Sequence, residues 1–228
     1  MKRFVIGDIH GAHRALLQCL QRAGFDYEMD LLISLGDVCD GWPETNQAVN
    51  ELLKIKNLQY ILGNHDYLTL QWMQYGIKDD VWLDQGGLAT LQSYNEEVNS
   101  QHKEFFERAL PYLIMDNKLF VHAGINPLKR IEEQTLEQFL WDRNLARIAI
   151  DLNGKGLETS LTVYDEVYLG HTPVSSYQPL YACGIWLMDT GAGWSGVLSL
   201  MNIDSKEIFT SDPVPTLYPG VEGRKRIR

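Results

Sequence analysis

The sequence has few of the features that mark secreted, membrane-spanning or nucleic-acid-binding proteins. It contains only three cysteines, Cys19, Cys39 and Cys183, and an odd number without a short paired spacing argues against a disulfide framework or a thiolate zinc site. Lysine and arginine (20) are outnumbered by aspartate and glutamate (30), which argues against a protein that grips nucleic acid. No apolar run approaches the roughly 18 residues that a membrane span needs. We therefore expect a soluble, cytoplasmic protein without nucleic-acid or membrane partners.

The composition is that of an ordinary globular protein, with 45% hydrophobic and 22% charged residues in a chain of 228. This length is enough to bury one core, so we predict a single domain over residues 1–212. The remainder, residues 213–228, contains prolines and ends in basic residues. We expect this tail to have little to bury and to be mobile.

Short apolar runs alternate with helical patterns along most of the chain, which indicates an α/β fold. Buried strands are predicted at residues 3–6, 31–35, 58–62, 119–121 and 167–169. Apolar residues at spacings of three and four predict helices at residues 14–22, 44–55, 67–75, 88–97 and 136–148. Later runs at residues 185–188, 196–201 and 207–210, separated by turn residues, predict an antiparallel end to the sheet.

Five polar strings follow five of these predicted strands. They are Gly7-Asp8-Ile9-His10-Gly11, Gly36-Asp37-Val38-Cys39-Asp40, Gly63-Asn64-His65-Asp66, His122-Ala123-Gly124 and Gly170-His171-Thr172. Because the loops after such strands share one rim of an α/β sheet, the strings should converge there. Asp8 and His10 are two residues apart, so an extended backbone would direct both to one side. Carboxylate, imidazole and amide ligands without thiolate favour manganese, iron or zinc.

The five strings resemble the motifs of the calcineurin-like metallophosphoesterases, and the resemblance covers residues 7–191. It is nearest to the phosphoprotein phosphatase branch, which includes bacterial and phage serine/threonine phosphatases and symmetrical dinucleoside-tetraphosphate hydrolases. The resemblance implies a sandwich of two mixed β-sheets flanked by helices, in four α/β/β/α layers. It also implies two divalent or trivalent metal ions (Mn, Fe or Zn), one held by Asp8, His10 and Asp37, and the other by Asp37, Asn64, His122 and His171.

A site of this kind is suited to phosphate-ester hydrolysis. Two metal ions outweigh the charge of the carboxylates Asp8 and Asp37, so the pocket would attract a phosphate group in an acidic protein. Binding to one metal can lower the pKa of water from about 15.7 to about 7, which supplies hydroxide to attack phosphorus. His65 lies beside the predicted ligand Asn64 and is placed to protonate the leaving oxygen. By resemblance, Asp40 would orient its imidazole.

The second string departs from the family pattern immediately after Asp40. The resemblance places Arg-Gly there, with the arginine clamping the phosphate, whereas this chain continues with Gly41-Trp42. A second clamp is predicted at Arg143, because Trp141-Asp142-Arg143 is similar to a Trp-any-Arg segment of the bacterial members, and a guanidinium suits phosphate geometry. Arg14 is a candidate replacement for the missing arginine. Trp42 is a candidate to stack on a nucleobase or another aromatic substrate.

Three functions are compatible with these residues. The favoured one is a serine/threonine-phosphatase-like phosphomonoesterase acting on a phosphorylated protein or a small phosphate ester. The alternative, which the missing arginine and Trp42 bring forward, is a hydrolase of nucleotides, dinucleoside polyphosphates or phosphodiesters. A non-catalytic scaffold is remote, because the chain keeps every predicted ligand and His65. The substitution Gly41→Arg would test the missing clamp by restoring it.

The remaining polar residues of interest receive structural expectations. His13 and His102 lie outside the strings and are predicted at the surface. Cys39 is expected to pack away from the site, and Asp66 to start a helix or orient a ligand. Asp189 is predicted to be a structural residue at the end of a strand.

Overall fold

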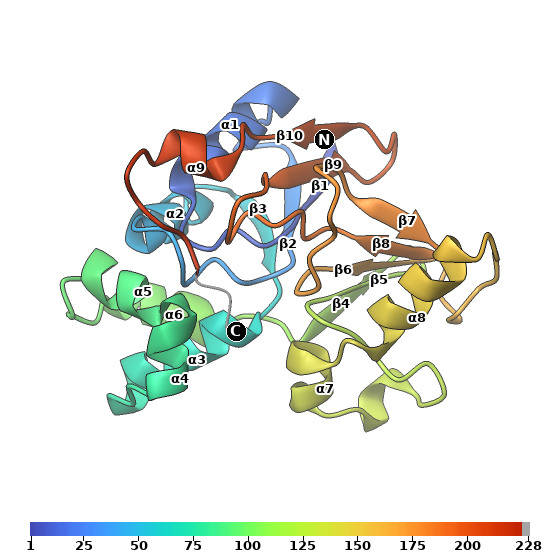
Figure 1. The fold of residues 1–228 in the computed structure, drawn as a ribbon, viewed down its shortest axis with the longest axis horizontal. Coiled ribbons are helices and arrows are strands. Elements are labelled where there is room, and N and C mark those ends of the chain that lie inside the picture. Colours follow the sequence, from blue (N-terminus) through green and yellow to red (C-terminus); the bar gives the residue numbers. More distant parts are fainter. Residues whose placement is uncertain (225–228) are drawn as a thin grey trace.

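The computed structural model describes residues 1–224, and its first sheet is built largely from the N-terminal part of the chain (Figure 1). Its strand order is β10-β9-β1-β2-β3. Strands β1, β2 and β3 are parallel, with β1 at the centre of the sheet and β3 at its edge. Strand β9 runs antiparallel to both β1 and β10. The bounds are β1 (Arg3–Ile6), β2 (Leu31–Ser34), β3 (Asn57–Tyr60), β9 (Ser199–Asn202) and β10 (Ile208–Thr210).

The second sheet has the order β4-β5-β6-β8-β7. Strands β5, β6 and β8 are parallel, and an antiparallel strand closes each edge. The bounds are β4 (Tyr112–Met115), β5 (Lys118–Val121), β6 (Glu166–Leu169), β7 (Leu180–Ala182) and β8 (Ile185–Leu187). The antiparallel pairing expected for the last strands is found for β9 and β10, whereas β8 pairs antiparallel with β7 but parallel with β6.

Helices lie on the outer side of each sheet. Around the first sheet and below it in Figure 1 are α1 (His13–Ala23), α2 (Thr45–Leu52), α3 (Asn64–Tyr75), α4 (Asp80–Trp82), α5 (Leu88–Ser93), α6 (Ser100–Glu107) and α9 (Val214–Leu217). A π-helical turn, η1 (Leu83–Gly87), links α4 to α5. A 3-10 turn, η2 (Ile131–Glu133), precedes α7 (Leu136–Trp141) and α8 (Asn144–Gly154), which lie beside the second sheet.

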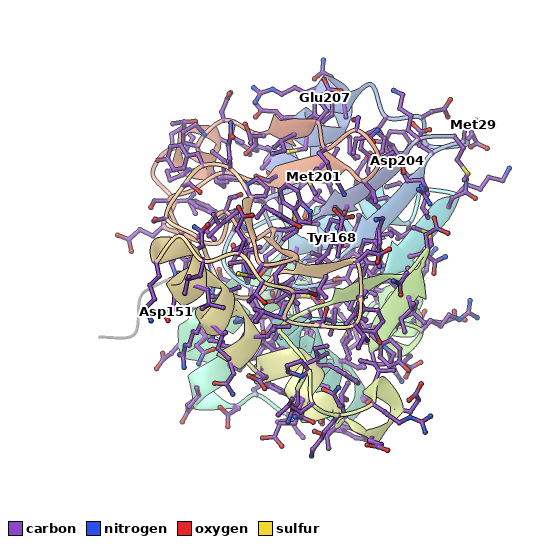
Figure 2. The ribbon with its side chains drawn as sticks, turned by 90° about the vertical axis from the view of Figure 1, so that its right-hand side faces the viewer. Met29, Asp151, Tyr168, Met201, Asp204 and Glu207 are labelled. Carbon is purple, nitrogen blue, oxygen red and sulfur yellow. The ribbon has the colours of Figure 1, made fainter. Side chains whose placement is uncertain are left out.

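Three buried clusters confirm the expected four layers of helix, sheet, sheet and helix. Alternation along β1 separates two of them, because Phe4 and Ile6 pack towards α1 while Val5 packs between the sheets. Tyr168 of β6 and Met201 of β9, both labelled in Figure 2, come from opposite sheets and share the central cluster. The third cluster joins β5, β6 and β8 to α7 and α8.

Two expectations for the chain need correction. The helix predicted over residues 136–148 is interrupted at Asp142 and Arg143, between α7 and α8. The tail predicted from residue 213 does bury side chains, since Val214 is 0% and Tyr218 is 2% exposed. Residues 225–228 of that tail lie outside the described part. Among residues 1–224, no helix is both long and apolar enough to cross a membrane.

Candidate metal centre and active site

The polar strings gather where the parallel strands of both sheets end. Asp8 follows β1, Asp37 follows β2 and Asn64 opens α3 after β3, while His122 and His171 follow β5 and β6 of the second sheet. The predicted ligands form two clusters, which we call the first metal group (Asp8, His10 and Asp37) and the second metal group (Asp37, His122 and His171). Within each group the ligand atoms lie within 4.8 Å of one another. The five strings therefore converge as expected, at a rim that both sheets share.

The Asp37 carboxylate faces both groups. Its Oδ2 atom lies 3.8 Å from His10 Nε2 and 3.4 Å from His122 Nε2. Asn64 joins the second group, because its Oδ1 atom lies 3.0 Å from the same His122 nitrogen. This is the arrangement that a carboxylate shared between two metal ions requires, and it supports Asp37 as the bridging residue.

Asp8 and His10 reach the same group by a route that differs from the expectation. The chain leaves the extended conformation at His10 itself, which has a left-handed φ of 51° and begins a turn. Backbone hydrogen bonds from His10 N to Asp37 O (2.8 Å) and from Gly11 N to Val38 O (2.7 Å) attach this turn to the second string. The two strings therefore hold one another in place at the rim.

Hydrogen bonds to the rings fix which imidazole nitrogens face the site. His10 Nδ1 lies 2.9 Å from Cys39 O, and His122 Nδ1 lies 2.7 Å from Leu35 O. In both rings Nε2 then faces the other predicted ligands, a common arrangement in metal-binding histidines. His171 Nε2 is buried and has no hydrogen-bond partner among residues 1–224. A buried nitrogen without a partner, beside carboxylates and imidazoles, fits a metal ion.

The electrostatics of the site also fit bound cations. Burial, followed by the nearby Asp189 carboxylate, raises the pKa of Asp8 well above its usual range. Burial also lowers the pKa of His171 well below the usual value, and the neighbouring His122 adds to this. Burial alone would lower the pKa of His122, but the Asp37 carboxylate raises it to about 9. Divalent ions would relieve the repulsion between these carboxylates, and at His122 the ion would take the place of the proton that Asp37 favours.

His65 and Asp40 form a buried pair at the edge of the metal groups. His65 Nδ1 lies 2.7 Å from Asp40 Oδ2, and the His65 ring stands edge-on to the His10 ring with centroids 5.1 Å apart. The backbone N–H of His65 donates to Asp37 Oδ1 at 2.9 Å. The structure thus brings together the predicted acid and its predicted orienting carboxylate, next to Asp37, the predicted bridging residue.

A family model for calcineurin-like phosphoesterases matches residues 1–194, which includes all five strings. The chain belongs to this family. It is therefore a phosphoesterase, a hydrolase of a family whose members use divalent metal ions.

Relatives of this phosphoesterase cover nearly the whole chain. Serine/threonine-protein phosphatase 1 of Salmonella typhimurium is 26% identical over 209 residues, which cover 88% of this chain and 91% of that protein. The asymmetrical bis(5'-nucleosyl)-tetraphosphatase PrpE of Halalkalibacterium halodurans is 30% identical over 254 residues and 97% of each chain. The fold is shared with a protein serine/threonine phosphatase from Saccharomyces cerevisiae, with a TM-score of 0.64, 13% identity and coverage of 98% and 82%.

A cavity of about 600 Å³ opens beside the metal groups of the phosphoesterase. Arg143 lines it and donates from Nη1 to His171 O at 2.7 Å. The break between α7 and α8 thus turns this arginine towards a predicted metal ligand. Tyr177 and Trp194 supply aromatic lining, and Arg224 lies on the same cavity. The cavity is much larger than a phosphate group requires and is within the usual range for a small-molecule site.

Two predicted substrate contacts are wrong. Trp42 is 1% exposed, donates its indole N–H to Ala192 O at 2.7 Å and stacks on Tyr218, so its ring is not available to a substrate. Arg14 donates to Glu44 Oε1 at 2.8 Å and to Leu217 O at 2.7 Å, outside the cavity that Arg143 lines. Arg14 thus links α1 to Leu217 of the C-terminal segment, and the Trp42 ring packs against Tyr218 of the same segment.

Of three other polar side chains with structural expectations, one has a different place from that expected. His102 is fully buried rather than at the surface, because Tyr94 and Asn50 provide partners for its two ring nitrogens at 2.8 and 3.1 Å. Asp66 accepts hydrogen bonds from the backbone of the second string and from Tyr60, which supports its expected orienting role. Asp189 is buried, and burial raises its pKa to about 6.

Arg224 is the site residue that the sequence analysis missed. Its Nη1 atom lies 3.2 Å from His10 Nε2, the nitrogen that faces the first metal group. A single arginine in a basic tail carries no motif. The only indirect signal for Arg224 was the departure from the family pattern at Gly41-Trp42. Both of these residues lie against the C-terminal segment that carries the arginine.

Proposed function

We propose that this phosphoesterase hydrolyses phosphoanhydride bonds of nucleotides of the dinucleoside-polyphosphate type. The observation that carries the proposal is the cavity beside the metal groups, whose lining combines Arg143 and Arg224 with Tyr177 and Trp194. Guanidinium groups suit a polyphosphate chain, and aromatic rings suit a nucleobase. The relative from Halalkalibacterium halodurans, which is matched over 97% of its length, is named for hydrolysis of such a nucleotide.

We assign the metal ligands as the geometry groups them. Asp8, His10 and Asp37 would hold one ion, and Asp37, Asn64, His122 and His171 would hold the other. Manganese, iron and zinc all suit carboxylate, amide and imidazole ligands. When bound, the ions would supply Lewis acidity and make water more acidic.

The residues of the chain would complete the reaction. As water attacks phosphorus and the bond to the leaving oxygen breaks, His65 would give the proton on Nε2 to that oxygen. Asp40 accepts from Nδ1 of the same ring, which holds Nε2 in position. Arg143, anchored to His171 O, would hold a phosphoryl oxygen of the substrate.

A serine/threonine phosphomonoesterase remains a second candidate function. The relative from Salmonella typhimurium carries that name and is 26% identical to this chain over 209 residues. A phosphopeptide substrate would also place its phosphate between Arg143 and the metal groups. The open, 600 Å³ cavity would then accept part of a peptide.

A substrate comparison separates the two candidates. The Mn²⁺-loaded protein would be given diadenosine tetraphosphate or a phosphoserine peptide, and kcat/KM would be measured for each. We expect kcat/KM for the nucleotide to be higher by at least about tenfold, equivalent to about 1.4 kcal/mol of transition-state binding. A preference for the phosphopeptide would contradict the nucleotide proposal and support the phosphomonoesterase.

A further inference from the structure

The C-terminal segment, residues 213–224, packs against the loop that departs from the family pattern. It follows β10, forms α9 and then continues towards the centre of the view in Figure 1. The Tyr218 ring stacks on Trp42 with centroids 5.1 Å apart, and its hydroxyl donates to Glu44 Oε2 at 2.6 Å. This segment is therefore attached directly to the residues that follow the second string.

Gly41 and Trp42 provide the space that the segment occupies. A side-chain Cβ at Gly41 would lie 3.0 Å from Cγ of Arg224 and 3.2 Å from His10 O. A Cβ at Gly223 would lie only 2.8 Å from the Trp42 ring, so a side chain there would separate the two. The residues that replace Arg-Gly in this chain are thus the same ones that admit Arg224 to the site.

Contacts on several sides hold the guanidinium of Arg224. Its Nε donates to Gln85 O at 3.0 Å, and its central carbon lies 4.6 Å from the centroid of the Trp194 ring. The Arg224 backbone N–H donates to Gly193 O at 2.8 Å. Burial raises the pKa of the Asp189 carboxylate and the Arg224 charge acts to lower it, yet no carboxylate of residues 1–224 lies within ion-pair distance of this guanidinium. Its charge is therefore available to an anion in the cavity.

We propose that Arg224 binds a phosphate group of the substrate in place of the arginine absent from the second string. Its Nη1 lies 3.2 Å from His10 Nε2, so a metal ion held by His10 and the guanidinium would be near neighbours. Two cations at such a distance repel unless an anion lies between them. Arg143 lines the same cavity and contacts His171 O, so two guanidinium groups border one space, each beside a predicted metal ligand, and that space suits a phosphate.

This inference rests on hydrolysis at the proposed metal centre but not on the choice between nucleotide and phosphopeptide. Phosphate is common to both substrates, so binding of inorganic phosphate tests Arg224 separately. Arg108 offers a matched control, because it is an exposed arginine that pairs with Glu104 on α6 and does not line the cavity.

The experiment is calorimetric titration of inorganic phosphate into the Mn²⁺-loaded protein. We expect Arg224→Ala to weaken phosphate binding by roughly 10- to 100-fold, the effect of losing hydrogen bonds to a charged group. Arg224→Lys should recover part of the affinity, and Arg108→Ala should bind as the wild type does. The manganese content and the unfolding temperature of every variant, measured in parallel, should match those of the wild type.

Two results would overturn the role of Arg224. One is unchanged phosphate affinity in a folded, metal-loaded Arg224→Ala protein. The other is tighter manganese binding with unchanged phosphate affinity in that variant, which would show that the arginine only competes for His10. If phosphate binding depends on Arg224 while diadenosine tetraphosphate is not hydrolysed, the inference stands and the proposed nucleotide substrate fails.

Discussion

His65 Nδ1 lies 2.7 Å from Asp40 Oδ2, and both side chains are buried beside the two groups of predicted metal ligands. Asp40 is itself held by hydrogen bonds, since its carboxylate accepts from Trp82 Nε1 and Thr90 Oγ1, each at 2.7 Å. These bonds leave the carboxylate one orientation and therefore fix the plane of the His65 ring. A ring fixed in this way can present Nε2 to a leaving oxygen without a search for the right rotamer.

Replacing His65 should affect turnover and leave metal binding intact. We expect His65→Asn to lower kcat by about 10²- to 10⁴-fold on a substrate with a poor leaving group, because the proton donor is lost. The loss should be much smaller with p-nitrophenyl phosphate, whose leaving group needs no proton. Steady-state kinetics and metal analysis check both points. The control His13→Asn should change kcat by less than about twofold, and equal losses on both substrates would argue against an acid role.

Replacing Arg143 should weaken substrate binding. The side chain is half-buried and anchored to His171 O, so Arg143→Ala should lower kcat/KM by roughly 10- to 100-fold, with much of the change in KM. Arg147, exposed one turn further along α8, is the matched control and should lose less than about twofold on conversion to alanine. Equal effects at the two positions would show that Arg143 contributes only general positive charge.

The structure changes the expected result of placing a side chain at Gly41. This glycine has a φ of 124°, a conformation that residues with a Cβ avoid. We therefore expect Gly41→Ala to lower the free energy of unfolding by about 1 to 3 kcal/mol, as measured by urea denaturation. Gly154→Ala is the control, because a Cβ there meets nothing within 4 Å, and it should be neutral or stabilising by up to about 1 kcal/mol.

The backbone conformation of Gly41 also means that Gly41→Arg would not restore a phosphate clamp. A stable, more active Gly41→Arg protein would contradict this account.

An ion-pair cluster around Glu166, away from the site, makes the stability of the fold depend on pH. Burial alone would raise the pKa of Glu166, but hydrogen bonds from Lys118 and Lys206, at 2.7 and 2.6 Å, lower it to about 2. The native state thus favours the charged form, and its contribution to stability is present above about pH 4.5 and lost as the pH falls towards 2.

Removal of this charge should accordingly matter only at higher pH. We expect Glu166→Gln to be less stable than the wild type by about 1 kcal/mol at pH 7. The difference in the free energy of unfolding, measured by urea denaturation at each pH, should shrink as the pH falls below about 4.5. A difference that is constant between pH 7 and pH 3 would show that the charge of Glu166 is not involved.

The strands and the convergence of the strings could be predicted because they depend on local pattern. The predicted strand at residues 3–6 has the observed bounds Arg3–Ile6, and the string after it begins at the next residue. Parallel strands bring their carboxyl ends to one edge, so the positions of Asp8, Asp37 and His171 followed from the order of elements. The resemblance supplied the layers and the grouping of ligands.

The errors concern contacts between segments that are far apart in the sequence. His102 is buried because Tyr94 and Asn50 satisfy its ring, and no local spacing indicates that Asn50 is near. Arg224 reaches His10 across more than 200 residues, in a tail whose composition suggested solvent. Trp42 looked like a substrate contact because a tryptophan in a loop is conspicuous, yet its partner Tyr218 belongs to that same tail. Such contacts depend on tertiary packing and leave no periodic signal.

The claim that the chain holds two metal ions can be tested most directly by anomalous diffraction from crystals grown with Mn²⁺. The account predicts two anomalous peaks on either side of the Asp37 carboxylate. One should lie against Asp8 and His10, and the other against Asn64, His122 and His171. A single peak, or two peaks of which neither contacts Asp37, would contradict the assignment of the site.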